Sequence, residues 1–598
     1  MAFLPTTYEE MIEAGFDQPD FVYVTGDAYV DHPSFGAAII TRILEHRGYK
    51  VCVLAEPDHR SNKDFKRFGK PRLGFLITGG NIDSMVNNYS VAKIRRKHDV
   101  YSHDGLNHRP DRALTVYSRL ARSAYPDCDI IVGGIEASLR RMAHYDYWDD
   151  AIRPSVLIDS EADLLMYGMG DLSIVEVAEA LDSGLRAKDL VYLDGVVYKT
   201  DDISYLSDHI MLPSFNDLKA DKMNYNASFK IQYQNTDHYH AKTLVEPYDG
   251  FYIVQNRPNR PLTQMELDDT YELPYERNYH FSYAQKGEHI ASIDEVKFSL
   301  ASNRGCFGAC SFCALTFHQG RIIQSRSKES LIKEAKKIIA MPDFKGYIHD
   351  VGGPTANFYH TACDFQKDRG VCPTHQCLSP RCPNLKVNHE DYLDILRALR
   401  NLEGVKKVFV RSGIRYDYLI YDQDETFFKE LVEHHISGQL KVAPEHVDDK
   451  VLDVMGKPHH DVYERFRSRY IKINQEMHKK QFLVPYLMSS HPGSDIDSAI
   501  ALAEYLRDIH YQPQQVQDFY PTPSTLSTVI YYTGVHPITG KKVFVEKSPH
   551  GKAIQRALMQ YKNPKHYGLV YEGLKKANRL DLVGYGPKCL IKPRRVEK

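Results

Sequence analysis

The sequence predicts an α/β protein in which an N-terminal doubly wound parallel-sheet domain is followed by a partial (βα)6 barrel and a short basic C-terminal extension. Three observations predict this class. Short apolar runs, several of them ending in glycine, alternate with helical patterns in the first 200 residues. From residue 291 onward, six strand-like runs are each followed by a helical pattern. In residues 541–598, Lys and Arg exceed Asp and Glu by 11.

The N-terminal domain is expected to cover residues 1–200. Its strand-like runs are 21–26, 49–55, 72–80, 128–134, 155–158 and 163–168, and helical patterns fall at 36–47 and 111–123. Ligands of doubly wound sheets bind beyond the carboxyl ends of the strands. The residues that mark this edge are Gly79, Gly80, Gly133, Gly134 and Glu136.

Residues 201–290 have little periodicity and are expected to form a connecting segment. The barrel is expected to cover residues 291–540, with a Cys-rich insertion at 354–389, and the basic extension follows at 541–598. The predicted barrel strands are 295–301, 344–351, 406–411, 438–443, 481–488 and 515–520.

The composition excludes several classes of protein. With 42% hydrophobic and 26% charged residues, the chain is neither disordered nor fibrous. No apolar run approaches the roughly 20 residues that span a bilayer, and the N-terminus lacks a signal-peptide pattern, so we expect a cytoplasmic protein without membrane contact. The net charge is −2, which leaves −13 outside the basic extension. That extension indicates an anionic partner or a solvated surface, and the acidic remainder gives nucleic-acid binding only weak support.

One sequence motif indicates a metal-binding site. The first barrel strand runs into Cys306, Cys310 and Cys313, spaced C-x3-C-x2-C. Three thiolates on one loop are suited to holding three irons of a cubane cluster, which leaves the fourth iron open to a small chelating molecule. The alternative is a structural zinc loop completed by a cysteine from the later cluster at 363–382.

These cysteines, with Phe312 before the last of them, resemble the signature of the radical S-adenosylmethionine (SAM) enzymes. The resemblance implies a [4Fe-4S] cluster whose open iron binds SAM, and cleavage of SAM to a 5′-deoxyadenosyl radical. It also implies SAM contacts at later strand ends, whereas it assigns no catalytic residue. The implied SAM contacts are Phe312, Gly352, Gly353, Arg411, Ser412 and Glu445.

The likeness is more specific than the superfamily. The stretches 304–327, 348–359, 411–419, 440–458, 489–495 and 519–534, together with 79–89, 132–141 and 251–277, are similar to the YgiQ family of radical-SAM proteins. This resemblance implies an unidentified substrate and an electron donor such as flavodoxin or ferredoxin. Two alternatives stay open: a cobalamin-dependent or methylthio-type modification of an RNA or protein, and a non-catalytic Fe–S regulatory protein.

A second cysteine cluster lies in the predicted insertion. Its members, Cys363, Cys372, Cys377 and Cys382, are spaced C-x8-C-x4-C-x4-C. Four thiols so close in sequence are able to ligate zinc or an auxiliary Fe–S cluster. However, the spacing contains no C-x2-C pair, so unbound structural thiols remain the alternative.

Many radical-SAM enzymes carry a doubly wound domain that binds cobalamin ahead of the barrel. Residues 132–138 resemble the loop that follows the nucleotide tail in such domains. The Asp-x-His-x-x-Gly motif that supplies the lower ligand is absent, because the nearest stretch, residues 31–36, has the wrong spacing. We therefore do not expect cobalamin; in the alternative, the domain covers the barrel mouth and shapes a substrate pocket.

Overall fold

The computed structural model describes residues 3–372 and 376–594, and the chain divides into two compact units. The first unit is formed by Met1–Phe307, Ala314–Thr374 and Asn388–Ser412. The second is formed by Gly308–Cys313, His375–Val387 and Gly413–Lys598. Along the chain, the loop that carries Cys306, Cys310 and Cys313 therefore begins in the first unit and continues in the second.

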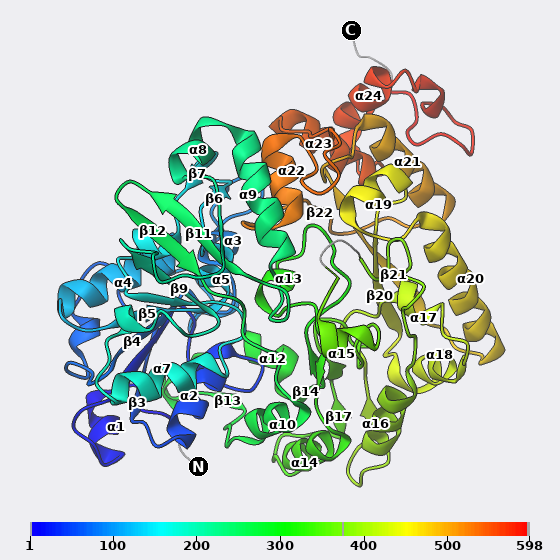
Figure 1. Ribbon diagram of the computed structural model, residues 1–598. Coiled ribbons are helices and arrows are strands. Elements are labelled where there is room, and N and C mark those ends of the chain that lie inside the picture. Colours follow the sequence, from blue (N-terminus) through cyan, green and yellow to red (C-terminus); the bar gives the residue numbers. More distant parts are fainter. Residues whose placement is uncertain (1–2, 373–375, 595–598) are drawn as a thin grey trace. The chain divides into compact units, whose positions relative to one another are not determined.

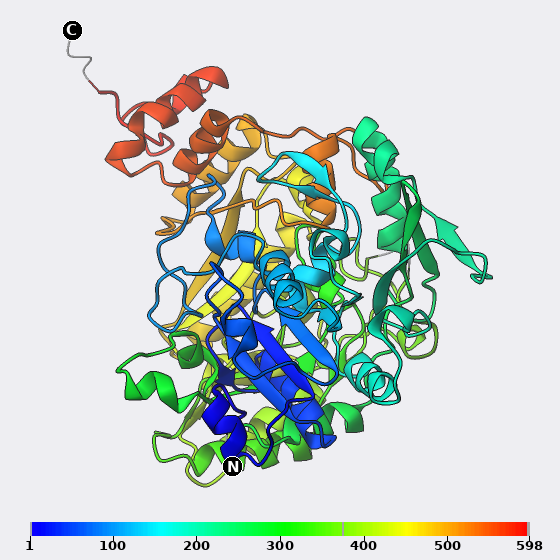
Figure 2. The ribbon, with the colours of Figure 1, turned by 90° about the vertical axis from the view of Figure 1, so that its left-hand side faces the viewer.

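A nine-stranded sheet forms the centre of the first unit (Figure 1). Strand β1 (Phe21–Thr25) pairs in parallel with β3 (Val51–Ala55) on one side and β4 (Gly74–Thr78) on the other, and these dark-blue strands run side by side in Figure 2. β5 (Ile130–Val132) and β8 (Leu164–Met166) continue the parallel part beyond β4. Because the winding direction reverses at β1, a ligand crevice is expected at the carboxyl ends of β1 and β4.

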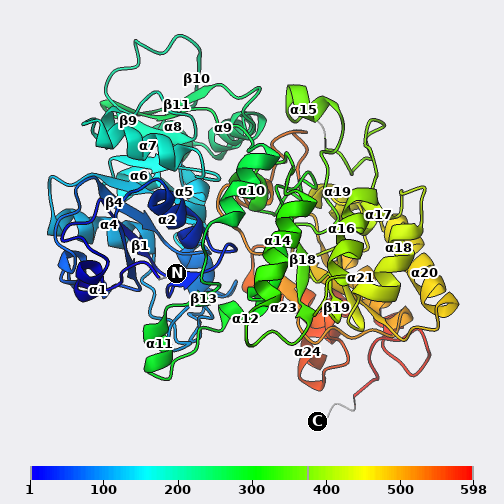
Figure 3. The same ribbon diagram turned by 90° about the horizontal axis from the view of Figure 1, so that it is seen from below.

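Helices cover both faces of this sheet, as the doubly wound prediction requires. On one face, α2 (Gly36–His46) and α7 (Ser173–Asp182) lie next to each other and bury alternate strand residues such as Tyr23 and Val53 (Figure 3). On the other face, α4 (Ala113–Ala124) packs on the intervening residues, such as Val22 and Leu54. Successive strand side chains point to opposite faces, so a strand buried on both sides is apolar throughout. The predicted fold class is confirmed.

The sheet continues past residue 200 in antiparallel form. β9 (Val196–Thr200) pairs antiparallel with β8 and with β12 (Phe251–Gln255), and β12 pairs antiparallel with β11 (Thr243–Tyr248). β10 (His209–Met211) closes the edge. Only Asp249 and Gly250 separate β11 from β12, and a two-residue connection forces neighbouring strands to run in opposite directions. Residues 209–255 thus contribute three strands rather than only connecting two domains.

One predicted strand is wrong. Residues 155–158 fold as the start of helix α6 (Val156–Asp159). The Ser155 hydroxyl accepts a hydrogen bond from Leu157 N–H, which caps the helix. Four apolar residues are too short a window to distinguish a buried strand from a buried helical turn.

The six strands predicted for the barrel are all present. In the first unit, β14 (Ser299–Ala301) pairs in parallel with β18 (Asp350–Gly352), and β17 (Tyr347–Ile348) pairs in parallel with β19 (Lys407–Val408). Helices α14 (Lys328–Ile339) and α16 (Glu390–Arg400) follow the first two strand positions and lie next to each other (Figure 3).

In the second unit, β20 (Gln439–Glu445), β21 (Phe482–Ser489) and β22 (Gln517–Asp518) form a parallel sheet. Helix α20 (His460–Glu476) connects the first pair of strands and α21 (Ile496–Asp508) connects the second. The repeat of strand and helix that the sequence predicts therefore continues through both units.

The basic C-terminal region is folded. Helices α23 (Pro549–Met559) and α24 (Tyr567–Lys576) share an apolar cluster with α21, in which Leu506, Leu558 and Leu574 are buried. Its charge is therefore displayed on a helical surface. Among the described helices, none combines the length and the apolar character needed to cross a bilayer.

Candidate functional site

The cysteine loop begins where β15 (Asn303–Arg304) ends. Cys306 N–H donates to Gly320 O at 3.1 Å, and the Cys306 Sγ lies 3.5 Å from Thr355 Oγ1. Gly305 has a φ of +84°, and a Cβ there would meet Ile322 O at 2.2 Å. Only glycine fits this close approach of two backbone segments. The first cysteine is therefore fixed on both sides by the fold of the first unit.

The rest of the loop belongs to the second unit and is anchored through Ser311. Its N–H donates to Met455 O at 2.9 Å, and its hydroxyl donates to Val454 O at 2.8 Å. Cys313 N–H donates to Cys310 O at 3.0 Å, which closes a tight turn between these two cysteines. The loop thus has a defined backbone on each side of Gly308 instead of a mobile tip.

The three motif thiols differ from the buried cysteines elsewhere in the chain. Cys306, Cys310 and Cys313 are in no disulfide and are partly exposed. By contrast, Cys52 and Cys128 are buried, and burial raises the pKa of Cys52 to about 12 and that of Cys128 to about 11. Metal ligation requires the thiolate. The motif thiols have the accessibility that ligands need, and the buried thiols of Cys52 and Cys128 do not.

Arg415 contacts the motif, although the sequence analysis did not select it. Its Nη1 lies 3.4 Å from Cys310 Sγ, while Nε and Nη2 donate to the Asp417 carboxylate at 2.8 and 2.5 Å. Both residues are buried. The ion pair with Asp417 thus holds the guanidinium of Arg415 in contact with a cysteine sulfur of the motif. In the sequence, the only indication that Arg415 belongs to the site was its position in the stretch 411–419, which is similar to the YgiQ family.

Glu445 ends β20 and is the most unusual of the predicted SAM contacts. It is buried and adopts a φ of +69°. Its Oε1 lies 3.8 Å from the buried Lys457 Nζ, whereas Oε2 has no hydrogen-bond partner among the described residues. Burial raises the pKa of this carboxyl, and Lys457 and Arg415 oppose the rise. A buried carboxylate oxygen without a partner costs free energy, which is typical of a position that awaits a ligand.

Phe312 stacks edge-on against His491, with 5.8 Å between the ring centroids. His491 Nε2 lies 2.7 Å from Ser527 Oγ, and burial lowers the pKa of His491 to about 3, so the imidazole is neutral. The ring of Phe312 is therefore held at its edge by a neutral partner. This arrangement fits the aromatic support that the resemblance implies for an adenine.

Arg411 and Ser412 meet at one carboxylate, that of Asp350, which the sequence analysis did not select. Asp350 Oδ1 accepts the N–H groups of Arg411 and Ser412 at 2.7 and 3.1 Å, and Oδ2 accepts the Ser412 hydroxyl. Burial raises the pKa of Asp350, and these donors oppose the rise. The predicted contacts of the first unit thus share one strand edge, although the side chain of Arg411 is exposed.

The two glycines leave little room for any side chain. A Cβ on Gly352 would lie 2.8 Å from Ser412 Oγ, and one on Gly353 would lie 2.3 Å from Asn303 O. The Gly352 carbonyl already accepts Ser302 N–H at 2.7 Å. Backbone approaches this close keep the strand ends of β14 and β18 together beside the start of the cysteine loop.

The second cysteine cluster is divided between the units. Cys363 and Cys372 belong to the first unit, and Cys377 and Cys382 belong to the second, where Cys382 N–H donates to Cys377 O at 2.9 Å. None of the four is in a disulfide. Metal binding by this insertion stays a prediction.

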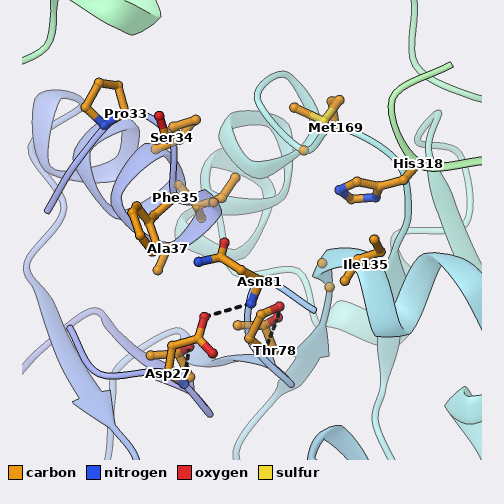
Figure 4. A pocket seen from close by; sticks show the side chains of 18 of the residues that line it. Asp27, Pro33, Ser34, Phe35, Ala37, Thr78, Asn81, Ile135, Met169 and His318 are labelled. Carbon is orange, nitrogen blue, oxygen red and sulfur yellow. Dashed lines mark hydrogen bonds between the residues drawn. The ribbon is translucent and has the colours of Figure 1, made fainter. Parts of the chain in front are cut away.

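A cavity of about 830 Å³ lies in the first unit at the carboxyl edge of the nine-stranded sheet (Figure 4). It is lined by the residues that follow β1, β4, β5 and β8, among them the predicted edge residues Gly80, Gly133 and Gly134. Asn303, Arg304 and Gly353 also line it. The cavity therefore occupies the crevice expected for a doubly wound sheet and reaches the residues that precede the cysteine motif.

Comparisons with known protein families agree with this geometry. Residues 3–299 match the family model described as "Radical SAM N-terminal", residues 301–506 match "Radical SAM superfamily", and residues 514–598 match a domain of unknown function (DUF3362). The chain is therefore a radical-SAM enzyme. These descriptions name no substrate.

Whole-chain relatives give the particular family. A UPF0313 protein of Clostridium perfringens (strain SM101 / Type A) is 56% identical over 593 residues, which cover 99% of this chain and 89% of the relative. One from Clostridium botulinum (strain Loch Maree / Type A3) is 55% identical, with 99% and 92% covered. The chain belongs to the UPF0313 family, also called the YgiQ family.

Solved structures are more distant. The radical SAM methyltransferase TsrM from Kitasatospora setae, solved with cobalamin and a [4Fe-4S] cluster bound, is similar with a TM-score of 0.46 and 14% identity, covering 85% of this chain and 74% of that one. The cobalamin-dependent radical enzyme OxsB, solved with aqua-cobalamin, has a TM-score of 0.45 and 10% identity, with 96% and 72% covered.

Proposed function

We propose that Cys306, Cys310 and Cys313 ligate three irons of a [4Fe-4S] cluster and that the chain binds SAM, for which Gly352 and Gly353 in the first unit and Glu445 in the second are the candidate contacts. The donor set fits the cluster, since the three thiols are partly exposed and in no disulfide, and soft thiolates are the ligands that iron–sulfur clusters use. A reduced cluster of this kind supplies the electron that cleaves SAM to methionine and a 5′-deoxyadenosyl radical.

The contact of Arg415 with Cys310 Sγ is the observation that carries this proposal. Asp417 fixes the guanidinium through Nε and Nη2, so Nη1 is directed at the sulfur without losing further side-chain entropy. Hydrogen bonds to ligating sulfur and nearby positive charge stabilise the reduced, more negative state of a cluster. Arg415 is a positioning and tuning residue in this proposal, because it acts through a ligand.

The proposed binding of SAM rests mainly on Glu445 Oε2, a buried acceptor without a hydrogen-bond partner among the described residues. Glu445 Oε2 is available to a hydroxyl or ammonium donor, and SAM presents both in its ribose and its methionine part. Phe312 offers an apolar face of the kind on which adenine rings stack. The roles of Arg411 and Ser412 are proposed through their backbone, which closes on Asp350.

The direct test is anaerobic reconstitution of the full chain with iron and sulfide, followed by reduction in the presence of SAM. We expect about four irons per chain if the insertion binds none, a reduced-cluster EPR signal that changes when SAM is added, and release of 5′-deoxyadenosine. A cluster whose EPR signal does not respond to SAM would contradict the proposal. A reductant of the flavodoxin or ferredoxin class is proposed to replace the chemical reductant in the cell.

Replacing Glu445 by glutamine should weaken SAM binding. A hydrogen bond to a charged acceptor contributes about 1.5–3 kcal/mol, so the dissociation constant should rise by about 10-fold to 100-fold. Equilibrium dialysis with labelled SAM on the reconstituted protein measures this change. The control is Glu433→Gln, whose side chain is 47% exposed and should bind SAM as the wild type does.

The double variant Arg415→Met/Asp417→Asn should retain its iron and shift the reduction potential of the cluster to a more negative value. Changing both residues avoids leaving Asp417 as an unpaired buried charge. An EPR-monitored redox titration measures the shift. Arg465→Met, at an arginine 53% exposed, is the control, and an unchanged potential in the double variant would remove the tuning role of Arg415.

A further inference from the structure

His318 lines the wall of the cavity at the edge of the nine-stranded sheet. It lies in α13 (Leu315–His318), directly after the cysteine loop, and its ring points into the cavity (Figure 4). Its Nδ1 lies 3.0 Å from the hydroxyl of Ser138 in α5 (Gly134–Leu139). Its Nε2 has no partner within the described part of the chain.

Ser138 fixes which nitrogen of His318 carries the proton. The single hydroxyl proton of Ser138 is donated to Gly134 O at 3.0 Å, and the same oxygen accepts Gly168 N–H at 2.9 Å. With that proton on Gly134 O, the hydroxyl accepts from His318 Nδ1, and this is the tautomer that we assign to the ring. The lone pair of the ring is then on Nε2, which faces the cavity.

The surroundings keep the ring neutral. The pKa of His318 is lowered to about 4, chiefly by burial and also by Arg304 and Arg141, while Asp171 acts in the opposite direction. Histidines that ligate metals have this form: they are neutral, and their second nitrogen donates to a protein group that sets the tautomer and the ring orientation. His318 has both properties, and the structure assigns no other role to it.

The charges on the cavity wall restrict the class of ligand. Asp27, Asp171, Asp294 and Glu295 line the cavity, against one cation, Arg304. A polyphosphate or a haem with its free carboxylates would meet net negative charge there. A neutral or cationic ligand that carries amides fits better: Asn81 points its side-chain amide into the cavity, and Arg304 Nη2 has no acceptor among the residues described (Figure 4).

The size and the apolar part of the wall agree with a large, flat ligand. The volume of about 830 Å³ is near the upper end for small-molecule sites, which is roughly 1,000 Å³. Phe35, Ala37 and Ile135 contribute apolar surface around the polar groups. An amidated tetrapyrrole with a central metal combines a large apolar ring, neutral side groups and a metal that binds an imidazole.

We propose that this cavity binds a corrinoid and that His318 Nε2 is the protein ligand of its cobalt. The sequence prediction against cobalamin was based on a missing motif at residues 31–36. In the structure, Asp31 pairs with the buried Arg42 and His32 Nδ1 accepts Ser34 N–H, so these residues serve packing. The imidazole comes from the segment after the cysteine loop, where no motif search would place it.

The test uses cobinamide, a corrinoid without a nitrogenous base of its own, added to the purified full-length protein. After reduction to Co(II), one axial nitrogen splits each high-field EPR line into three. Because cobinamide supplies no axial nitrogen, we expect this splitting to come from the protein. Labelling the protein with [15N]histidine should convert each triplet into a doublet, and this readout requires no substitution.

Variants then identify the histidine. His318→Ala should lose the nitrogen splitting, and Ser138→Ala should raise the dissociation constant of cobinamide about tenfold or more. His289→Ala, at a histidine 56% exposed, should behave as the wild type does. If cobinamide fails to co-elute with the wild-type protein, or binds without nitrogen splitting, the proposal is overturned. Cys310→Ala should still bind cobinamide, which separates this site from the cluster.

Discussion

Alanine in place of Cys306, Cys310 or Cys313 is expected to abolish SAM cleavage. Each of these thiols is partly exposed and in no disulfide, and a cubane held by only two protein thiolates is not stably retained. We expect bound iron and sulfide to fall to near background in each variant, and 5′-deoxyadenosine formation to fall below detection. Iron and sulfide analysis after anaerobic reconstitution, with chromatographic assay of 5′-deoxyadenosine, measures both effects.

Cys128→Ala is the matched control for these variants, because Cys128 is buried in the sheet and burial raises its pKa to about 11. It should keep both the iron and the activity. Retention of a full cluster in any motif variant would instead mean that other residues supply the ligands. Loss of folding is excluded by circular dichroism of each apoprotein.

Glu334→Ala should destabilise the first unit by about 3–5 kcal/mol, the usual cost of removing one partner from a buried ion pair. Glu334 lies on α14 and accepts hydrogen bonds from Arg277 and Arg326, and all three residues are buried. Its removal leaves two arginines without their carboxylate. Hydrogen exchange of α14 peptides in increasing urea, followed by mass spectrometry, measures the change within this unit.

The buried ion pairs of Glu334 with Arg277 and Arg326 also make the stability of the first unit depend on pH. Burial alone would raise the pKa of Glu334, but Arg326 and Arg277 lower it below its usual value of 4.5. The stabilisation by Glu334 is therefore complete above pH 4.5 and is lost as the pH falls through the lower pKa of the folded state.

The control for Glu334→Ala is Glu272→Gln, which breaks an exposed contact with Lys333 and should lower the stability of the first unit by at most about 1 kcal/mol. An equal loss in both variants would contradict the prediction.

The sequence predicts the architecture well because both halves depend on periodic burial. The strands around β1 are apolar throughout since helices cover both faces, and the six barrel repeats keep a regular alternation. The antiparallel extension could not be predicted in the same way. Tyr248 and Phe251 flank a two-residue turn in a segment with little periodicity, and the pairing partners of such a hairpin are long-range contacts.

The residues of the candidate site also divide into those that the sequence predicts and those that only the structure reveals. The spacing of Cys306, Cys310 and Cys313 is a local property and is legible in one sequence. Arg415, by contrast, lies more than 100 residues from Cys310, and its importance depends on the ion pair with Asp417. Ser138 and His318 are 180 residues apart. The proton position on such an imidazole follows from three-dimensional hydrogen bonding, which no spacing rule contains.

The ion pair between Arg304 and Asp171 has a consequence for communication within the first unit. Arg304 precedes Cys306 by two positions and shares its buried guanidinium with the loop after β8, through two contacts of 2.9 Å to Asp171. Both side chains line the cavity. An occupant that displaces either one would therefore act on the backbone two positions before the first motif thiol. If occupancy of the cavity changes the affinity of that thiol for iron, thermodynamic reciprocity requires iron to change the affinity of the cavity by the same factor.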